Sequence, residues 1–460
     1  MKLKSCFLLM LMVCAFFSCS DNDDPVNLTI TPVVPDATLS LAVQTDNRVK
    51  TKGGFIDDDN AETKPTWDSE VNTLTAVIFN NGAYPDESNI PVGGIAAIFT
   101  QGYDEPTSAP VISGEVKSGK VNLLLIANLE ADVLKRLTSS VNSAVPRERL
   151  KVADVLKLAT PLSSETKDNG LTMSSEVLSL ELVAGINFVG FGSLGSYTDP
   201  SYGTGTEVYG ENPVVLTRTV AAIKLKGVLL PETPDSENLE YKNVSFTLDS
   251  VFVANVKSTA GIGTNSDVTT IEQSPLKNGA LDLTYYLAPI KYASHTGTYK
   301  TGEAKGDDSM LRVLNQPLMI SAKPGTTVNN TTEPDWINNI IPPCYVYPNQ
   351  DGETGVTGKN NYTLLVLRGS YTYKIGDSAP VTENNRYYTV IINDNSQGGT
   401  ISGDEGKTNV HIQRNTKYNV TVQILGSGSN DPFTPAAFAH VAAQVKVADW
   451  NVIEIDQDVD

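Results

Sequence analysis

The side chains near the start of this chain that bear on chemistry are three basic residues in one polar stretch. Arg48, Lys50 and Lys52 are spaced two apart and lead into the glycine pair Gly53 and Gly54. Proteases of trypsin-like specificity cut after lysine or arginine, and exposed polar loops are where such cuts occur. We therefore expect a protease-sensitive loop here, in which this chain is the substrate of a protease and not itself a catalyst.

A short strand is predicted directly before this loop, over residues 37–44. Leu39, Leu41 and Val43 alternate with small or polar residues, so they point to one face of the strand. A strand that supplies core residues is thus followed at once by a protease-sensitive loop. Proteolysis there would detach the strand from an otherwise folded domain.

The chain begins with a pattern typical of a bacterial export signal, residues 1–18. Lys2 and Lys4 precede an apolar run over 6–17, which is too short to span a bilayer as a helix. The run ends in Phe-Phe-Ser-Cys at Cys19, which resembles a lipobox, although phenylalanine stands where leucine is usual. The resemblance implies cleavage before Cys19 and a lipid on its thiol. An ordinary signal peptide that is cut nearby is the alternative.

An acidic run, Ser-Asp-Asn-Asp-Asp at residues 20–24, follows the cysteine. In surface lipoproteins of the Bacteroidetes such a run directs export to the outer face, so the resemblance implies the cell surface. The alternative is a solvated tether. Residues 19–48 would then form a lipidated propeptide that carries the first strand.

Length and composition limit the classes of function. A chain of 460 residues is too long for one ordinary core, so two domains are expected. Hydrophobic residues make up 40% and charged residues 19%, which is typical of a globular protein. The net charge of -19 repels phosphate backbones. We therefore expect no nucleic acid among the partners.

Four cysteines do not make a disulfide framework here. Cys6 and Cys14 leave with the signal, and Cys19 would carry lipid, so Cys344 alone remains. It lies in a short predicted strand and is expected to be a buried core thiol.

No catalytic constellation is visible in the sequence. His295, His411 and His440 have no further ligand at metal-binding spacing, and the motifs of hydrolases, zinc proteases and dinucleotide-binding enzymes are missing. We therefore expect neither an enzyme nor a cofactor.

Strand patterns dominate the rest of the chain. Strands are expected at 73–79, 121–127, 176–182, 186–191, 216–230, 244–256, 281–287, 345–347, 362–367, 387–392, 418–425 and 441–447. Helical spacing occurs at 129–141 and 152–159, and the Gly- and Ser-rich stretch 190–210 is the expected domain edge. These patterns predict an all-β protein with β-sandwich domains over 49–212, which has a few short helices, and 213–460.

Four short segments carry a resemblance to a known family. Ser-Gly-Lys-Val at 118–121 opens an apolar strand that ends in Ala-Asn, and Leu-Thr-Arg-Thr-Val-Ala-Ala-Ile occupies 216–223. Gln-Arg-Asn-Thr-Lys-Tyr-Asn-Val follows at 413–420, and Val-Lys-Val-Ala-Asp-Trp at 445–450. With the lipobox, their order resembles that of the fimbrillins, the major pilin subunits of Bacteroidetes type V pili.

The resemblance implies two transthyretin-like β-sandwiches with Greek-key character, and a polymer as the functional form. Fimbrillins are exported as outer-membrane lipoproteins, and a trypsin-like or Arg-specific surface protease then cuts after the first strand. Arg48 best matches that cut, with Lys50 and Lys52 as alternatives. The resemblance implies that the vacated groove takes the C-terminal strand of an identical or related pilin subunit, head to tail. The expected donor residues are Val452, Ile453 and Ile455.

Elementary energetics agrees with this scheme, because each of three buried Leu or Val side chains is worth roughly 1.5–3 kcal/mol. A groove that has lost them should therefore seek a replacement strand. The alternative is a surface lipoprotein that never polymerises and binds glycans or host proteins through its β-sandwiches. A host protein or glycan receptor is compatible with both interpretations.

Overall fold

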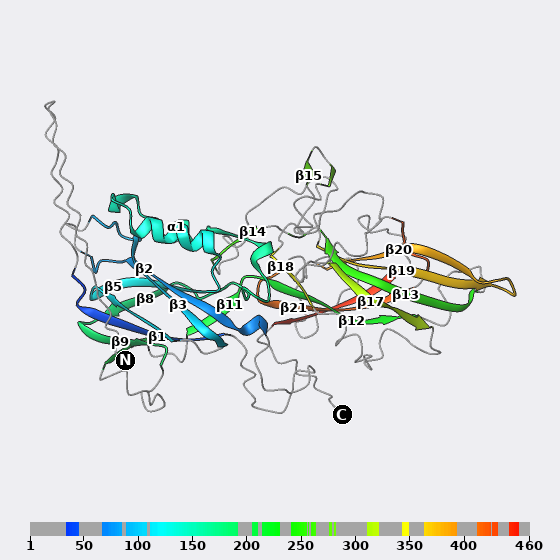
Figure 1. Cartoon of the computed structure of the whole chain (residues 1–460), viewed down its shortest axis with the longest axis horizontal. Coiled ribbons are helices and arrows are strands. Elements are labelled where there is room, and N and C mark those ends of the chain that lie inside the picture. The colour runs from blue at the N-terminus through cyan, green and yellow to red at the C-terminus, as the bar shows by residue number, and fades with distance from the viewer. Residues whose placement is uncertain are drawn as a thin grey trace, which may run out of the picture.

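A computed structural model of the chain shows strand-rich parts that follow one another along its long axis (Figure 1). The structure describes residues 34–45, 67–84, 89–107, 111–191, 205–209, 214–230, 241–254, 256, 259–263, 276–277, 280–281, 311–321, 343–348, 363–392, 412–424, 426–430 and 441–449.

The N-terminal part is built on one ten-stranded sheet with the order β10-β9-β1-β11-β7-β5-β2-β3, to which β4 adds on β1 and β8 on β5. Its strands are β1 Ala37–Thr45, β2 Val71–Asn80, β3 Ile95–Thr107, β4 Val111–Val116, β5 Gly119–Ala127, β7 Met173–Ser174, β8 Leu178–Leu182, β9 Gly185–Val189, β10 Thr206–Tyr209 and β11 Val214–Arg218.

Two α-helices occur in the part of the chain that the structure describes, α1 Ala131–Val141 and α2 Val152–Leu156. The Glu130 carboxylate caps α1 by accepting from the backbone N–H groups of Asp132 and Val133 at 3.0 and 3.1 Å. The buried face of α1 packs on one side of β2 and β5. Both predicted helices are confirmed, but the second is shorter, because Ala159 begins the strand β6 Ala159–Pro161. Short 3-10 helices complete this part: η1 Trp67–Ser69, η3 Pro146–Glu148 and η4 Leu162–Ser164.

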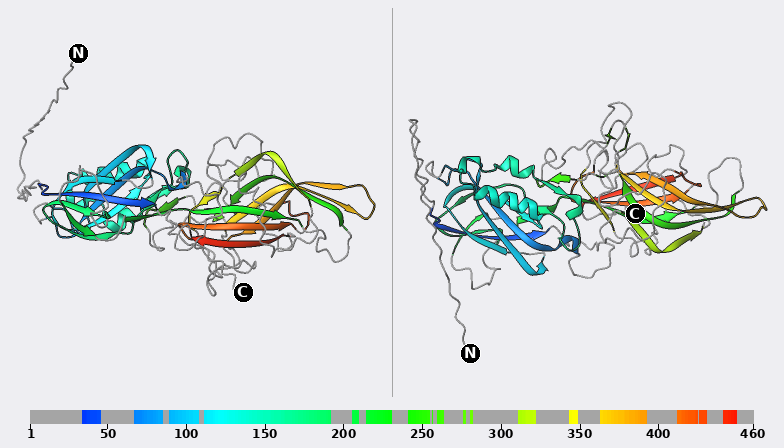
Figure 2. Two further views of the ribbon diagram at one scale, coloured as in Figure 1. Left: turned by 90° about the horizontal axis from the view of Figure 1, so that it is seen from below. Right: turned by 45° about the horizontal axis from the view of Figure 1, so that its top comes forward.

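The C-terminal part consists of two four-stranded sheets over a common core, as two views show (Figure 2). One has the order β18-β12-β21-β22, with β12 Ala221–Leu229, β18 Cys344–Val346, β21 Thr416–Ile424 and β22 Val441–Asp449. The other has the order β17-β13-β19-β20, with β13 Tyr241–Ala254, β17 Leu311–Ser321, β19 Leu364–Ile375 and β20 Val381–Ile391. Two small pairs complete the fold: β14 Thr259–Gly261 with β6, and β15 Leu276–Lys277 with β16 Ala280–Leu281.

The sandwich core contains buried side chains from both sheets, and aromatic rings of one sheet contact each other within it. Phe246 of β13 and Tyr388 of β20 meet edge to face with ring centroids 4.9 Å apart. Cys344 is 2% exposed within the same core, as predicted for this thiol. The all-β fold predicted from the sequence is confirmed.

The single strand expected over 216–230 is two strands in two different sheets. β11 pairs in parallel with β1, whereas β12 pairs in parallel with β21. The chain passes between the two parts at Thr219 and Val220, so β11 belongs to the sheet of the first part although 213 was the expected start of the second domain. The stretch expected as the domain edge contains β10, which pairs with β9.

None of the helices in the described ranges is long and apolar enough to cross a membrane.

Candidate functional site

The predicted first strand, β1, has three neighbouring strands, and we call the position that they form around it the bed of β1. It pairs with β9 in parallel and with β4 antiparallel, and its last residues pair with β11 in parallel (Figure 1). Leu41 stands opposite both Val189 of β9 and Ile112 of β4, while Val43 stands opposite Val214 of β11. Both edges of β1 are thus used, so its removal would leave ladder groups of β4, β9 and β11 without partners.

The side chains of β1 are buried on both faces. Leu39 and Leu41 are 0% exposed and Val43 is 1% exposed, in one core cluster with residues of β2, β5, β9 and β11. This confirms the predicted inward row. On the other face Ser40 is also buried, and Ala42 packs with Phe188 of β9 and Phe191, which follows β9. The alternation along β1 therefore does not separate core residues from solvent-exposed residues.

A polar cluster holds the beginning of β1. The Asp36 carboxylate accepts from the backbone N–H of Ser118 at 2.7 Å, from the Ser118 hydroxyl at 3.0 Å and from the Lys117 ammonium. The Asp36 backbone N–H donates to the carbonyl of Val116 at 3.2 Å, and the N–H of Gly185 donates to the Asp36 carbonyl at 3.0 Å. We call this set the Asp36 clamp. No local sequence pattern predicts it, because its halves are far apart in the chain.

The Asp36 clamp predicts a pH dependence of the attachment of β1. The hydrogen bond from Lys117, followed by that from the Ser118 N–H, lowers the pKa of Asp36 from 3.8 to about 2. A carboxyl whose pKa is lower in the folded state stabilises it above its unfolded pKa, and this contribution is lost as pH falls towards 2. The unfolding midpoints of the wild-type protein and Asp36→Asn should therefore differ at pH 6 and converge between pH 4 and pH 2. Midpoints that stay equally far apart down to pH 2 would show that the clamp does not act through the charge.

The remaining predicted site residues lie outside the residues that the structure describes. They are Cys19, Arg48, Lys50, Lys52, Val452, Ile453 and Ile455. The last described residue of β1 is Thr45, and that of β22 is Asp449.

A second site joins the two parts of the molecule, and Arg414 is its centre. Its guanidinium donates to the carbonyls of Thr217 at 2.9 Å, Arg218 at 3.0 Å and Ile262 at 3.4 Å, to the Ser174 hydroxyl at 3.2 Å, and to the carbonyl of Gly263. Burial lowers the pKa of Arg414 to about 10, so the side chain stays protonated at neutral pH. One cation thus binds the backbone of β11 and of the two residues that follow β14, and a side chain of β7.

Arg218 completes the junction from the other side. It is 0% exposed, and it donates to the carbonyl of Asp68 at 2.7 Å and to Asn415 Oδ1 at 3.3 Å. Asn415 has a φ of 53°, and its N–H donates to the carbonyl of Val220 at 2.7 Å. The segments 216–223 and 413–420, which the sequence analysis singled out separately, therefore meet in space.

Glu165 is a buried carboxyl at the same junction. It accepts from the Thr172 N–H at 2.7 Å and from the Tyr347 hydroxyl at 2.8 Å, and Tyr347 also contacts the Thr160 hydroxyl at 3.1 Å. Burial raises the pKa of Glu165, and that of Tyr347 as well. Isolated glutamates are common in an acidic chain, so no sequence signal marked this one.

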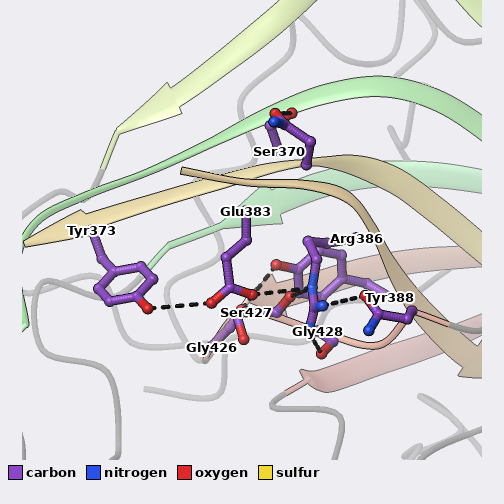
Figure 3. A network of polar contacts seen from close by, with 10 residues as sticks. Ser370, Tyr373, Glu383, Arg386, Tyr388, Gly426, Ser427 and Gly428 are labelled. Atoms are coloured by element: carbon purple, nitrogen blue, oxygen red, sulfur yellow. Dashed lines mark hydrogen bonds and ion pairs between the residues drawn. The ribbon is translucent and has the colours of Figure 1, made fainter. Parts of the chain in front are cut away.

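A third polar network fixes the loop that follows β21 (Figure 3). Arg386 donates to the carbonyls of Ser427 at 2.5 Å and Gly428 at 2.6 Å, and pairs with Glu383 at 3.4 Å. Tyr388 donates to the Gly426 carbonyl at 2.9 Å. A Cβ at Gly428 would lie 2.8 Å from the Tyr387 carbonyl oxygen, so glycine is needed for this approach. The network holds β20 against the segment that leads towards β22.

None of the described residues form a group of three or more His, Cys, Asp or Glu side chains that could hold a metal ion. The three histidines of the chain lie outside the described ranges.

Two family models match parts of the chain that contain β1 and the strands around it, and the C-terminal strands. Residues 37–218 match the family model of the major fimbrial subunit protein FimA. They run from the first residue of β1 to the last of β11. Residues 358–450 match the model of the FimA4 pilin C-terminal domain.

Individual relatives give the same result. The major fimbrium subunit FimA type-2 of Porphyromonas gingivalis is 24% identical over 329 residues, which is 66% of this chain and 71% of that protein. A solved structure from Parabacteroides distasonis, assigned to cell adhesion, has 28% identity and a TM-score of 0.61, and covers 91% of this chain and 100% of its own. A fimbrillin structure from Porphyromonas gingivalis shares the fold, with a TM-score of 0.54 at 17% identity over 91% of this chain and 99% of its own. The chain belongs to the fimbrillin family, the fimbrial subunits of the Bacteroidetes.

Proposed function

We propose that this protein is a pilin that polymerises when a surface protease removes β1 and a neighbouring subunit replaces it. The observation that supports this most strongly is the bed of β1. A strand that is bonded on both edges and buried on both faces is followed, after Thr45, by the basic loop. A protease-sensitive loop directly after a core strand would let proteolysis destabilise the domain. Such an arrangement is stable only if another strand takes the place of the one that is removed.

The proposed order of events begins with a lipoprotein precursor. Cys19 would carry the lipid and hold the chain at the outer membrane, with the acidic run after it directing export to the cell surface. A trypsin-like or Arg-specific protease would cut after Arg48, or after Lys50 or Lys52, and so release residues 19–48. While it stays in place, β1 fills its own bed and prevents premature assembly.

The replacement strand would come from the C-terminal segment of the next subunit, with Val452, Ile453 and Ile455 as its apolar residues. The bed offers ladder groups from β4 and β9, as in other cases where an extended segment completes a sheet. The contact joins the end of one subunit to the bed of another, so it does not close on itself and extends as a filament. Adhesion through the resulting fibre, to a host protein or a glycan, is part of this proposal.

Trypsin digestion of the purified precursor tests the proposal. We expect cleavage in the basic loop, seen by N-terminal sequencing of the large fragment, to be followed by ladders on a native gel and fibres in electron microscopy. The triple variant Arg48→Ala, Lys50→Ala, Lys52→Ala is the control and should stay monomeric under the same treatment. Clean cutting in the loop without any polymer would contradict the proposal and favour a surface lipoprotein that does not assemble.

A further inference from the structure

Cleavage in the basic loop, the step of the proposed function on which this inference rests, would separate the two halves of the Asp36 clamp. Asp36 lies on the N-terminal side of the basic loop and leaves with the propeptide. Lys117 and Ser118 lie in the turn between β4 and β5, and they remain with the domain. Cleavage therefore removes the carboxylate and keeps the groups that bind it.

The half that remains has contacts of its own that do not involve β1, although β4 before it pairs with β1. Gly119 ends the turn with a φ of 117°, and a Cβ there would lie 2.9 Å from the Cα of Ala83. The N–H of Ala83 in turn donates to the carbonyl of Lys120 at 3.0 Å. The turn is thus fixed by backbone packing against the end of β2, so an ammonium, a hydroxyl and a backbone N–H stay close together. Three donors in this arrangement suit a carboxylate, and charge-assisted bonds to it are the strong kind.

We propose that Lys117 and Ser118 form a carboxylate-binding site at the end of the groove, which sets the register of the strand that replaces β1. The occupant is an acidic side chain in the C-terminal segment of a second copy of this chain. That segment, residues 450–460, contains Glu454, Asp456, Asp458 and Asp460 and no lysine or arginine. Its charge is therefore complementary to that of the vacated clamp.

A register device is physically useful in this groove. A strand that slips by one residue turns its whole apolar row to the opposite face. Both faces of the β1 position are buried, so the burial of apolar area alone distinguishes the two registers less sharply than in a half-exposed strand. A fixed charge at one end penalises every register that leaves Lys117 without a partner.

Binding of a synthetic peptide tests the site directly. A fluorescent peptide of residues 450–460 is titrated onto trypsin-processed protein, together with a second peptide in which the four acids are replaced by Gln or Asn. We expect Lys117→Gln to weaken binding of the acidic peptide about tenfold, as for loss of one charge-assisted hydrogen bond, and to leave binding of the amide peptide nearly unchanged. Lys120→Gln, at the start of β5, is the matched control, and Lys117→Arg should retain most of the affinity.

Equal affinity of wild-type and Lys117→Gln protein for the acidic peptide would overturn the clamp while leaving strand replacement intact. If neither peptide binds the processed wild-type protein, both the clamp and the proposed function are wrong. The thermal unfolding of each uncut variant, measured first, shows whether a loss of binding is a loss of folding. A variant that unfolds early is replaced in the titration by Ser118→Ala, which removes the hydroxyl donor alone and should give a smaller loss in the same direction.

Discussion

Replacing Leu41 by alanine is expected to lower the free energy of unfolding of the uncut protein by about 2–5 kcal/mol, because this side chain is 0% exposed and its loss leaves a cavity. The same substitution should not alter fibres assembled from processed protein. In the proposed assembly Leu41 has left with the propeptide before the fibre forms. Denaturant unfolding of the precursor and thermal dissociation of the fibre measure the two effects separately.

Leu123 of β5 provides the matched control. It is also 0% exposed and lies in the same core cluster as Leu41, but it stays with the domain after cleavage. Leu123→Ala should therefore weaken both the precursor and the fibre. If Leu41→Ala weakened the fibre as much as Leu123→Ala does, then β1 would still be present in the fibre, and strand replacement would be wrong.

Replacing Arg414 by alanine is expected to destabilise the uncut protein by about 3 kcal/mol or more, because it leaves several carbonyl groups and a hydroxyl at the junction without a donor. The guanidinium contacts backbone at Thr217, Arg218, Ile262 and Gly263. We expect the first and second parts to unfold at separate denaturant concentrations in this variant. Circular dichroism combined with limited proteolysis at each denaturant concentration would resolve the two transitions.

Arg147→Ala serves as the control for Arg414. Arg147 is exposed and donates to Asn89 Oδ1 at 3.1 Å, so its loss should change the stability by no more than about 0.5 kcal/mol. Arg414→Lys should fall between the two, since one ammonium cannot reproduce the planar fork of donors. An unchanged, single transition for Arg414→Ala would show that the junction does not depend on this side chain.

The sequence predicted the strand β1 and its inward row because Leu39, Leu41 and Val43 alternate with small or polar residues, although burial of the other face was not predictable from that alternation. It did not separate β11 from β12, since no Gly, Pro, Asn or Asp at Thr219 and Val220 signals a turn between them. β3 was missed for a different reason. It interrupts its apolar residues with Gly102 and Pro106, and much of it is exposed or half-buried.

The residues of the candidate site also differ in how far the sequence predicts them. Arg414 and Arg218 lie in segments that a family resemblance could mark, but their role at the junction was not predictable. Their partners are mostly backbone carbonyls, which every residue type supplies. The Asp36 clamp needs the β4–β5 turn and the start of β1 to be brought together by the fold, and no local pattern encodes that distance.

The direction of β1 has a mechanical consequence. The strands of both parts run roughly along the long axis of the molecule (Figure 1). A replacement strand in the same bed would lie along the fibre, while its hydrogen bonds to β4 and β9 would run across it, from strand to strand. Tension on such a fibre would load all these bonds in shear at once instead of opening them one after another. A fibre of weak individual bonds could thus resist the pull of flowing liquid on an attached cell.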